Sequence, residues 1–367
     1  MPRKLTNSTF AGVSASGPDE AWAVGTFSDQ SALDHPLVEH WNGTKWALIH
    51  VPQPAGQQAV LSGVDDLAPD NAWAVGESFS GSGQNGLTLI EHWNGTAWSI
   101  VPSPSPAVGA GGDSNVLTSI SGTGSDDLWA AGSENNENTA TLSVLLEHWD
   151  GTAWTVATSP TPMFASQIAT AITAISPDDV WVVGEQFTDS MRTLAAHWDG
   201  TAWSIVRTPD LSSAGTPQNQ LTGVSAAGPD DVWASGFANN VDKHNLDVPY
   251  TLHWNGTTWQ LAKVPSMGSD GSRLNGIVAL SATDAWTVGQ IQESDGALLT
   301  ITEQFNGSAW KIVASPDPGS LGKLVVNTLQ WVGSAGGKDL FAVGTQEIPG
   351  QLVNRTLAGG RRVRRRR

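Results

Sequence analysis

Five histidines occupy the same place in a repeated tryptophan-rich motif, and histidine is a common metal ligand. We predict a hydrogen-bonding role for them instead. Copies of a repeat lie in separate structural units, so their side chains cannot converge on one ion at ligand distances of about 2 Å. We expect each histidine to bond the acidic residue that opens the neighbouring strand, as Asp19 would for the first copy. The five are His40, His92, His148, His197 and His253, and Gln304 takes the place in a sixth copy.

Paired carboxylates could act as the acid and the base of glycoside hydrolysis. The adjacent pairs in this chain follow Pro or Ser in a short repeated turn, where Asp hydrogen-bonds its own backbone. We therefore predict turn residues rather than catalysts. Glu39, Glu91 and Glu147 each precede one of the histidines, and we expect them to be solvated or bonded within their own repeat. The Asp pairs are Asp126–Asp127, Asp178–Asp179 and Asp230–Asp231.

Two motifs place these residues in a repeat. The first, of the form D-x-W-A-V-G, occurs seven times, and its aromatic anchors lie 51 to 56 residues apart. The second, of the form H-W-[N/D]-G-T-x-W, follows each of the first six copies. Together the motifs hold 17 of the 18 tryptophans, and the exception is Trp331. The anchors are Trp22, Trp73, Trp129, Trp181, Trp233, Trp286 and Phe341.

Each repeat predicts four short strands. Residues 221–226, LTGVSA, are typical of the first strand, and a tight turn leads from it to the D-x-W-A-V-G strand. A variable loop precedes the third strand, as at 88–93, and Asn-Gly or Asp-Gly then forms a hairpin turn. Proline ends the fourth strand because it cannot donate to a strand ladder. No sustained 3.6-residue period indicates a helix.

Four-stranded units without helices at this period indicate a β-propeller. We predict an all-β fold in which residues 1–360 form a single seven-bladed β-propeller of four-stranded antiparallel blades, with the seventh blade incomplete. The repeats cover approximately residues 9–57, 58–113, 114–167, 168–219, 220–272, 273–325 and 326–358.

The repeat resembles those of kelch and galactose-oxidase-type propellers. The shared features are a Gly that closes strand two, an aromatic residue in strand three and a Trp that opens strand four. The match is closer to Trp-rich propeller repeats of bacterial hypothetical proteins, because kelch repeats carry a Gly pair where this chain has one Gly, such as Gly25. The resemblance implies the fold and favours an extracellular setting. Copper-radical chemistry does not carry over, because it needs a Cys–Tyr crosslink and this chain has one tyrosine, Tyr250, and no Cys.

Charge and composition limit the partners. The 367 residues carry a net charge of −17, although six of the 18 basic residues lie in the last seven positions. The rest of the chain is therefore strongly acidic, and we expect it to repel nucleic acids. No apolar run is long enough for a transmembrane helix, and residues 1–10 lack the apolar core of a signal peptide. We expect no cofactor, no metal and no membrane contact, and a monomer whose partner is a polysaccharide or a protein.

The strand order assigns function to one face of the propeller. The one-to-two and three-to-four turns are short and share one face, the turn face, whereas the longer, variable connections share the other, the loop face. Variable loops on a rigid scaffold often carry binding residues. The loop-face candidates are Asp29, Asp34, His35, Glu77, Asn85, Glu134, Asn136, Glu185, Asp189, Asn240, Lys243, His244, Glu293 and Asp295.

Two functions fit such a loop face. We expect a non-catalytic binding module for a carbohydrate or a protein, because these polar side chains suit sugar hydroxyls or polar peptides. The alternative is a carbohydrate-active hydrolase or lyase. An enzyme would need two carboxylates, or a histidine and a carboxylate, that converge near the axis. Asp34, His35, Asp189 and His244 are the candidates for that role.

The last repeat changes character after Ala358, where GGRRVRRRR replaces the expected H-W-[N/D]-G-T-x-W text. One interpretation is an Arg-rich tail, residues 361–367, that binds polyanions. The other is a frameshift or truncation of the gene, which we favour because GC-rich DNA read out of frame yields runs of Arg and Gly. We expect half of the third strand and all of the fourth strand of the seventh blade to be missing, which would expose a sheet edge.

Overall fold

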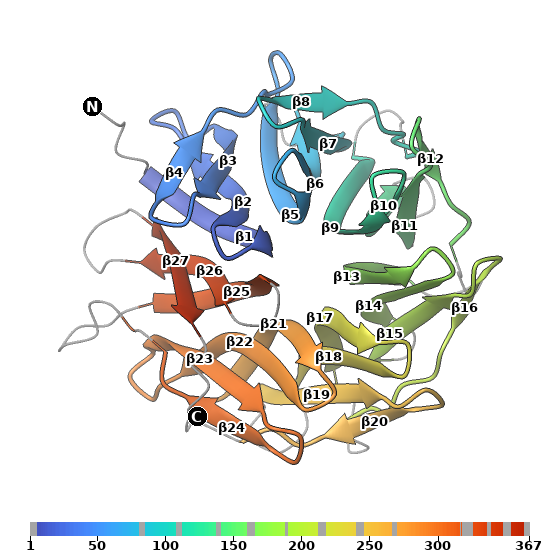
Figure 1. Cartoon of the computed structure of the whole chain (residues 1–367), viewed down its shortest axis with the longest axis vertical. Coiled ribbons are helices and arrows are strands. Elements are labelled where there is room, and N and C mark those ends of the chain that lie inside the picture. Colours follow the sequence, from blue (N-terminus) through green and yellow to red (C-terminus); the bar gives the residue numbers. More distant parts are fainter. Residues whose placement is uncertain are drawn as a thin grey trace.

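The computed structural model describes residues 6–80, 85–107, 112–136, 141–159, 166–187, 190–211, 218–239, 246–265, 270–315, 317, 326–335, 339–347 and 354–362. Within these ranges the chain forms 27 β-strands and no α-helix. The sheets stand around a central axis in sequence order, as the blades of a propeller (Figure 1). No helical segment in this part of the chain has the length and apolarity needed to span a bilayer.

Each repeat adds its strands from the axis outward, every one antiparallel to its predecessor. The innermost strands are β1 (Thr6–Gly17), β5 (Gln58–Ala68), β9 (Ser114–Gly124), β13 (Ser166–Ser176), β17 (Gln218–Gly228), β21 (Ser272–Ser281) and β25 (Val326–Ala335). The second strands are β2 (Glu20–Ser28), β6 (Asn71–Phe79), β10 (Asp127–Asn136), β14 (Asp179–Phe187), β18 (Asp231–Asn239), β22 (Asp284–Gln292) and β26 (Asp339–Glu347).

The third strands follow the variable loops and lead into the hairpin turns, and the short fourth strands follow those turns. The third strands are β3 (Asp34–Trp41), β7 (Leu87–Trp93), β11 (Thr141–Trp149), β15 (Met191–Trp198), β19 (Val248–Trp254), β23 (Leu298–Phe305) and β27 (Asn354–Arg362). The fourth strands are β4 (Trp46–Ile49), β8 (Trp98–Val101), β12 (Trp154–Val156), β16 (Trp203–Ile205), β20 (Trp259–Ala262) and β24 (Trp310–Val313).

The prediction of seven blades is wrong, because the strands hydrogen-bond into six sheets. Five sheets have four strands each, whereas β21 to β27 form one sheet of seven strands. A parallel pairing of Leu298 with Val326 joins β23 to β25 and continues the sheet of the sixth repeat into the seventh. Sequence periodicity counts repeats, but hydrogen bonds between strands define blades. The fold is therefore an all-β, six-bladed propeller built from four-stranded antiparallel units.

The third strand of the seventh repeat is longer than the repeat text predicts. β27 pairs with β26 from Asn354 opposite Glu347 to Arg362 opposite Asp339. The backbone of Gly359 to Arg362 therefore continues the strand, although the H-W-[N/D]-G-T-x-W text is absent there. Strands pair through backbone groups, so β27 forms without the side chains of the H-W-[N/D]-G-T-x-W motif. The prediction that half of this strand is missing is therefore wrong. Residues 363–367 of the predicted Arg-rich tail lie outside the described ranges.

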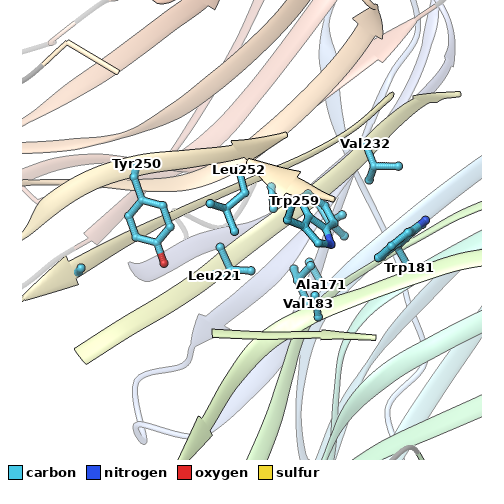
Figure 2. Close-up of a cluster of buried hydrophobic side chains, with 12 residues drawn as sticks. Ala171, Trp181, Val183, Leu221, Val232, Tyr250, Leu252 and Trp259 are labelled. Carbon is cyan, nitrogen blue, oxygen red and sulfur yellow. The ribbon is translucent and has the colours of Figure 1, made fainter. Parts of the chain in front are cut away.

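A tryptophan on the second strand of one repeat packs against two aromatic side chains of the next. The ring centroid of Trp22 lies 4.9 Å from that of Trp93 and 5.1 Å from that of Trp98. The planes of Trp22 and Trp98 meet edge-on, at 89°. Trp181 and Trp259 repeat the edge-on contact within the buried cluster shown in Figure 2. Offset and edge-on aromatic pairs add to the stabilisation from burial. The periodic tryptophans thus hold neighbouring repeats together.

The innermost strands of the first six repeats come close to one another at a position that holds a small residue. A Cβ on Gly63 would lie 2.9 Å from the Cα of Ser119, and one on Gly276 would lie 3.0 Å from the Cα of Trp331. Such distances leave little or no room for a side chain. This explains the small residue of the L-x-G-V-S strand, which is Gly12, Gly63, Ser119, Ala171, Gly223 or Gly276 in the first six repeats.

Glu91 and Glu147 contradict the prediction of a solvated or bonded side chain, whereas Glu39 is partly exposed. Glu91 and Glu147 are 0% exposed, and so is the equivalent Glu303 of the sixth repeat. Among the described residues, neither carboxylate oxygen of these three side chains has a hydrogen-bond partner. Burial raises the pKa of each carboxyl to about 8. Successive side chains of a strand point to opposite faces. The residue after each glutamate is partly exposed, and the glutamate itself therefore points into the protein.

Candidate functional site

The turn face is held together by hydrogen bonds that recur in the first six repeats. The partner of the His40 Nε2 is the Glu20 Oε1, at 2.6 Å, rather than Asp19 as expected. The His40 ring also stacks on Trp22 with the ring centroids 4.3 Å apart. The indole N–H of Trp41 donates to the Pro18 carbonyl at 3.1 Å, so the two short turns lie side by side. The equivalent side-chain pairs are His92–Asn71, His148–Asp127, His197–Asp179, His253–Asp231 and Gln304–Asp284.

The paired aspartates divide their roles on this face. The second aspartate of each pair bonds the histidine, whereas the first lies against the glycine of the neighbouring hairpin turn. A Cβ on Gly151 would come within 2.9 Å of the Asp126 side chain, and one on Gly200 within 2.7 Å of Asp178. Among the described residues, no group of three or more His, Asp and Glu side chains could hold a metal ion. The turn face therefore consists of repeated structural contacts.

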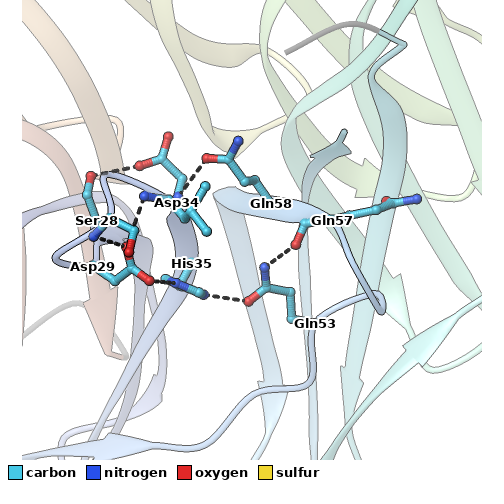
Figure 3. Close-up of polar contacts among 9 residues, drawn as sticks. Ser28, Asp29, Asp34, His35, Gln53, Gln57 and Gln58 are labelled. Carbon is cyan, nitrogen blue, oxygen red and sulfur yellow. Dashed lines mark hydrogen bonds and ion pairs between the residues drawn. The ribbon is translucent and has the colours of Figure 1, made fainter. Parts of the chain in front are cut away.

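Three of the loop-face candidates meet in the first repeat (Figure 3). The His35 Nε2 lies 3.2 Å from an Asp29 oxygen, and its Nδ1 lies 2.7 Å from the Gln53 Oε1. Asp34 accepts from the Ser28 hydroxyl at 2.7 Å. Hydrogen bonds from the Leu33 N–H and from His35 lower the pKa of the Asp29 carboxyl. The cluster's polar groups therefore bond to one another and hold the loop in shape.

The other loop-face candidates are distributed over separate blades. Burial raises the pKa of the glutamates on three different second strands, Glu77, Glu134 and Glu185. Asp295 accepts from the Ala297 N–H at 3.0 Å inside its own turn. Each candidate thus lies by the loop of its own repeat, and the described ones do not form a shared cluster. Asn85, Asn136 and Glu293 lie in further loops or strand ends, and Asp189, Asn240, Lys243 and His244 lie outside the described ranges.

A cavity lies on the axis, between the loop-face ends of the innermost strands. Its volume is about 300 Å³, and we call it the mouth of the central channel. Most of its lining comes from one position of the innermost strand, where a β-bulge inserts an extra residue. The lining residues are Thr9, Phe10, Ala11, Ser62, Thr118, Thr170, Thr222, Asn275, Gln330 and Trp331.

The bulge residues also bind the repeats to one another. The Thr170 hydroxyl lies 3.1 Å from the Val183 carbonyl of its own repeat and 2.6 Å from the Leu221 carbonyl of the next. Thr222 and Thr118 make the same two bonds, and the Asn275 amide N–H₂ reaches the Leu329 carbonyl at 2.7 Å. A hydroxyl has one proton and two lone pairs. Because these protons go to backbone carbonyls, the side-chain oxygens remain as acceptors at the mouth.

Trp331 is the largest side chain in the channel. It stands where the other repeats have Gly, Ser or Ala, and it is half-buried. Its indole packs against the buried cluster that contains Val224 and against the one that contains Val13. It lines both the mouth and a second cavity of about 190 Å³ nearer the turn face. The side chain therefore lies where the two cavities meet.

The second cavity contains the carboxylate of the channel. Asp65 lines it and accepts from the Gly122 N–H at 2.7 Å and from the Ser14 hydroxyl at 3.4 Å. Burial raises the pKa of Asp65 to about 6 and that of the neighbouring Asp66 to about 7. Asp66 accepts from the Ser16 N–H at 2.8 Å. Both acids break the repeat, because the equivalent pairs are Ser, Thr or Val followed by Ala or Gly in the other five of the first six repeats, and Gly333–Ser334 in the seventh.

The mouth is the part of the site that sequence reasoning missed. The candidates that the sequence suggests are charged and amide side chains on the long connections, whereas the mouth is built from the innermost strands. One signal was present in the sequence. Trp331 was the single tryptophan outside the two motifs, and it replaces a residue that close strand packing keeps small.

No family model and no curated protein matches this chain. Solved structures match its fold over nearly the whole length. One is an ulvan lyase of a polysaccharide lyase family, PL25, with 10% identity and a TM-score of 0.58, covering 98% of this chain and 97% of that chain. A second is YCF48 bound to D1 peptide, with 13% identity and a TM-score of 0.54, covering 92% and 91%. A third is the GH93 α-L-arabinofuranosidase of Fusarium graminearum, with 12% identity and a TM-score of 0.51, covering 99% and 95%.

Proposed function

We propose that this protein is a non-catalytic binding module that receives a carbohydrate at the mouth of the central channel. The observation that carries the proposal is the set of side-chain oxygens that line this cavity. The hydroxyls of Thr118, Thr170 and Thr222 give their protons to the backbone and keep acceptor lone pairs, and Asn275 donates from its amide nitrogen and keeps its side-chain carbonyl oxygen. Such fixed neutral acceptors suit a ligand rich in hydroxyl donors.

The position of the acidic groups supports binding rather than hydrolysis. A hydrolase or lyase at the mouth would need an acid and a base beside the ligand. The channel carboxylate, Asp65, lies in the second cavity, beyond Trp331. Among proteins of similar fold, the ulvan lyase and the arabinofuranosidase act on carbohydrates, whereas YCF48 is bound to a peptide. The fold is thus compatible with catalysis and with binding, and the resemblance to kelch and galactose-oxidase repeats remains a prediction.

A glycan array followed by product analysis tests the proposal. We expect the full chain to retain one or more glycans on the array and to slow the same polysaccharide in affinity electrophoresis. Prolonged incubation with the retained glycan should release neither new reducing ends nor unsaturated sugars. Release of either product would identify a hydrolase or a lyase. Failure to retain any glycan, together with capture of a peptide from a peptide array, would replace the carbohydrate by a protein ligand.

A further inference from the structure

The mouth contains one large aromatic surface among small polar groups, and this combination indicates how a ligand would sit. Trp331 replaces the Gly, Ser or Ala of six equivalent strands, although the repeat needs a small residue there for close strand packing. A side chain that fills the channel is not required by the fold, because the other strands pack without one. Its partly exposed side chain lines the mouth cavity.

We propose that the Trp331 indole is the floor on which one neutral sugar ring stacks, and that the mouth accepts the terminal residue of a glycan end-on. This inference rests on the proposed function and assigns its ligand class. The flat indole would contact the C–H face of the sugar. The acceptor oxygens of Thr118, Thr170 and Thr222 would receive its hydroxyl protons.

The geometry of the channel favours the end of a chain over its middle. The innermost strands surround the axis on all sides, so a ligand reaches the cavity along the axis from the loop face (Figure 1). Trp331 lines both cavities and lies at their junction. A polysaccharide therefore has an entrance but no wide exit past the indole. The volume of about 300 Å³ is at the lower end for ligand pockets, which suits one sugar ring better than several.

The neutral lining favours a sugar over a cationic side chain. An ammonium group could also donate to these oxygens and lie over the indole. However, a buried cation needs a paired anion to offset its lost hydration. The described lining of the mouth supplies hydroxyl, amide and aromatic groups, and Asp65 lies in the other cavity. Neutral hydroxyl donors avoid that cost.

Fluorine NMR of the full chain labelled with 5-fluorotryptophan tests the inference. Trp331→Phe identifies the Trp331 resonance by its loss. The probes are the methyl glycosides of common neutral hexoses and deoxyhexoses, methyl glucuronide, and Nα-acetyl-lysine methylamide. We expect one or more neutral methyl glycosides to shift the Trp331 signal saturably. A shift caused by the lysine derivative alone, or by no methyl glycoside, would overturn the inference.

Matched variants separate stacking from folding. Trp331→Ala introduces the residue that Ala171 provides in the fourth repeat, and Trp198→Phe introduces the residue that Phe305 provides in the sixth. We expect Trp331→Ala to weaken methyl glycoside binding about tenfold, Trp331→Phe to weaken it less, and Trp198→Phe to leave it unchanged. Equal affinity in the Ala variant and the parent would overturn the inference. A melting curve for each variant shows whether it is folded.

The two proposals fail in different ways. If the glycan array retains a polysaccharide but the Trp331 signal does not respond to methyl glycosides, the end-on site is wrong and carbohydrate binding stands. If internal fragments of the retained polysaccharide bind as well as its terminal fragments, end-on recognition is likewise wrong. If the array retains no glycan and no methyl glycoside binds, both proposals fail.

Discussion

Phe341 of the seventh repeat meets Trp46 of the first repeat edge-on, with the ring centroids 6.0 Å apart and the planes at 88°. The same phenylalanine lies 6.2 Å from Trp41. This is the contact by which a second-strand aromatic joins each of the first five repeats to its successor, such as Trp22 to Trp98. The two ends of the repeat array are therefore joined by the same packing that joins its interior, and within the described residues this contact closes the ring.

Phe341→Ala should destabilise the whole ring. The side chain is 3% exposed, and removing a buried phenylalanine costs about 3–5 kcal/mol. We expect a lower urea midpoint with one cooperative transition, because β1 and β26 are in contact at the closure. Phe341→Trp, which restores the residue of the other repeats, is the control and should lose less. An unchanged midpoint for the Ala variant would show that ring closure does not depend on this contact.

Glu91→Leu should stabilise the protein above pH 5 and make its stability less dependent on pH. Leu252 already occupies the equivalent place in the fifth repeat. Burial raises the folded-state pKa of Glu91 to about 8, so between about pH 4.5 and pH 8 the folded carboxyl binds a proton that the unfolded one has released. Stability then falls as pH rises through this window, by up to about 1.4 kcal/mol per pH unit for each such glutamate.

Urea unfolding at pH 5 and pH 8 checks the role of Glu91. The gain of the Leu variant should be larger at pH 8 than at pH 5. Glu293→Leu on the loop face is the control, because Glu293 lies partly exposed in a turn. Equal gains at the two pH values would mean that the carboxylate is not held in an apolar environment.

Thr222→Val should loosen one junction between repeats. The variant keeps the shape of the side chain and removes the proton shared by the Ser235 carbonyl at 3.1 Å and the Leu274 carbonyl at 2.7 Å. We expect a loss of about 1–2 kcal/mol in unfolding free energy, because a part-buried carbonyl loses its donor. Thr222→Ser retains the hydroxyl and should keep most of the stability. If Ser and Val behave alike in urea unfolding, the hydroxyl bond contributes nothing.

Asp65→Ser should leave ligand binding at the mouth intact while it stabilises the protein at neutral pH. Serine is the residue of three equivalent strands, and in those of Ser121 and Ser225 it accepts from a backbone N–H of the next repeat. Burial raises the folded-state pKa of Asp65 to about 6, so the aspartate costs stability as pH rises from about 4 to 6. Glycan affinity measured at pH 7 should match the parent. A loss of binding or of any sugar-cleaving activity would assign function to the second cavity.

The sequence by itself determined the repeat, the four-strand unit and the roles of most recurring side chains. Trp22 and its equivalents, and the Asn-Gly or Asp-Gly turns, act through neighbours in their own or the adjacent repeat, so periodicity reveals them. The same local logic led to the pairing of His40 with an acidic residue at the start of strand two, although Glu20 rather than Asp19 takes the bond.

Only the tertiary structure decided the number of blades, the burial of the third-strand glutamates and which residues line the mouth. The pairing of Leu298 with Val326 merges two repeats into one sheet, and no local pattern encodes a bridge between strands of different repeats. Glu91 is fully buried on a strand, β7, that lies against β9 of the next repeat. The mouth brings single residues such as Thr118, Asn275 and Trp331 together from repeats far apart in the chain. Closure of the ring around an axis creates that neighbourhood, and it exists only once every repeat is in place.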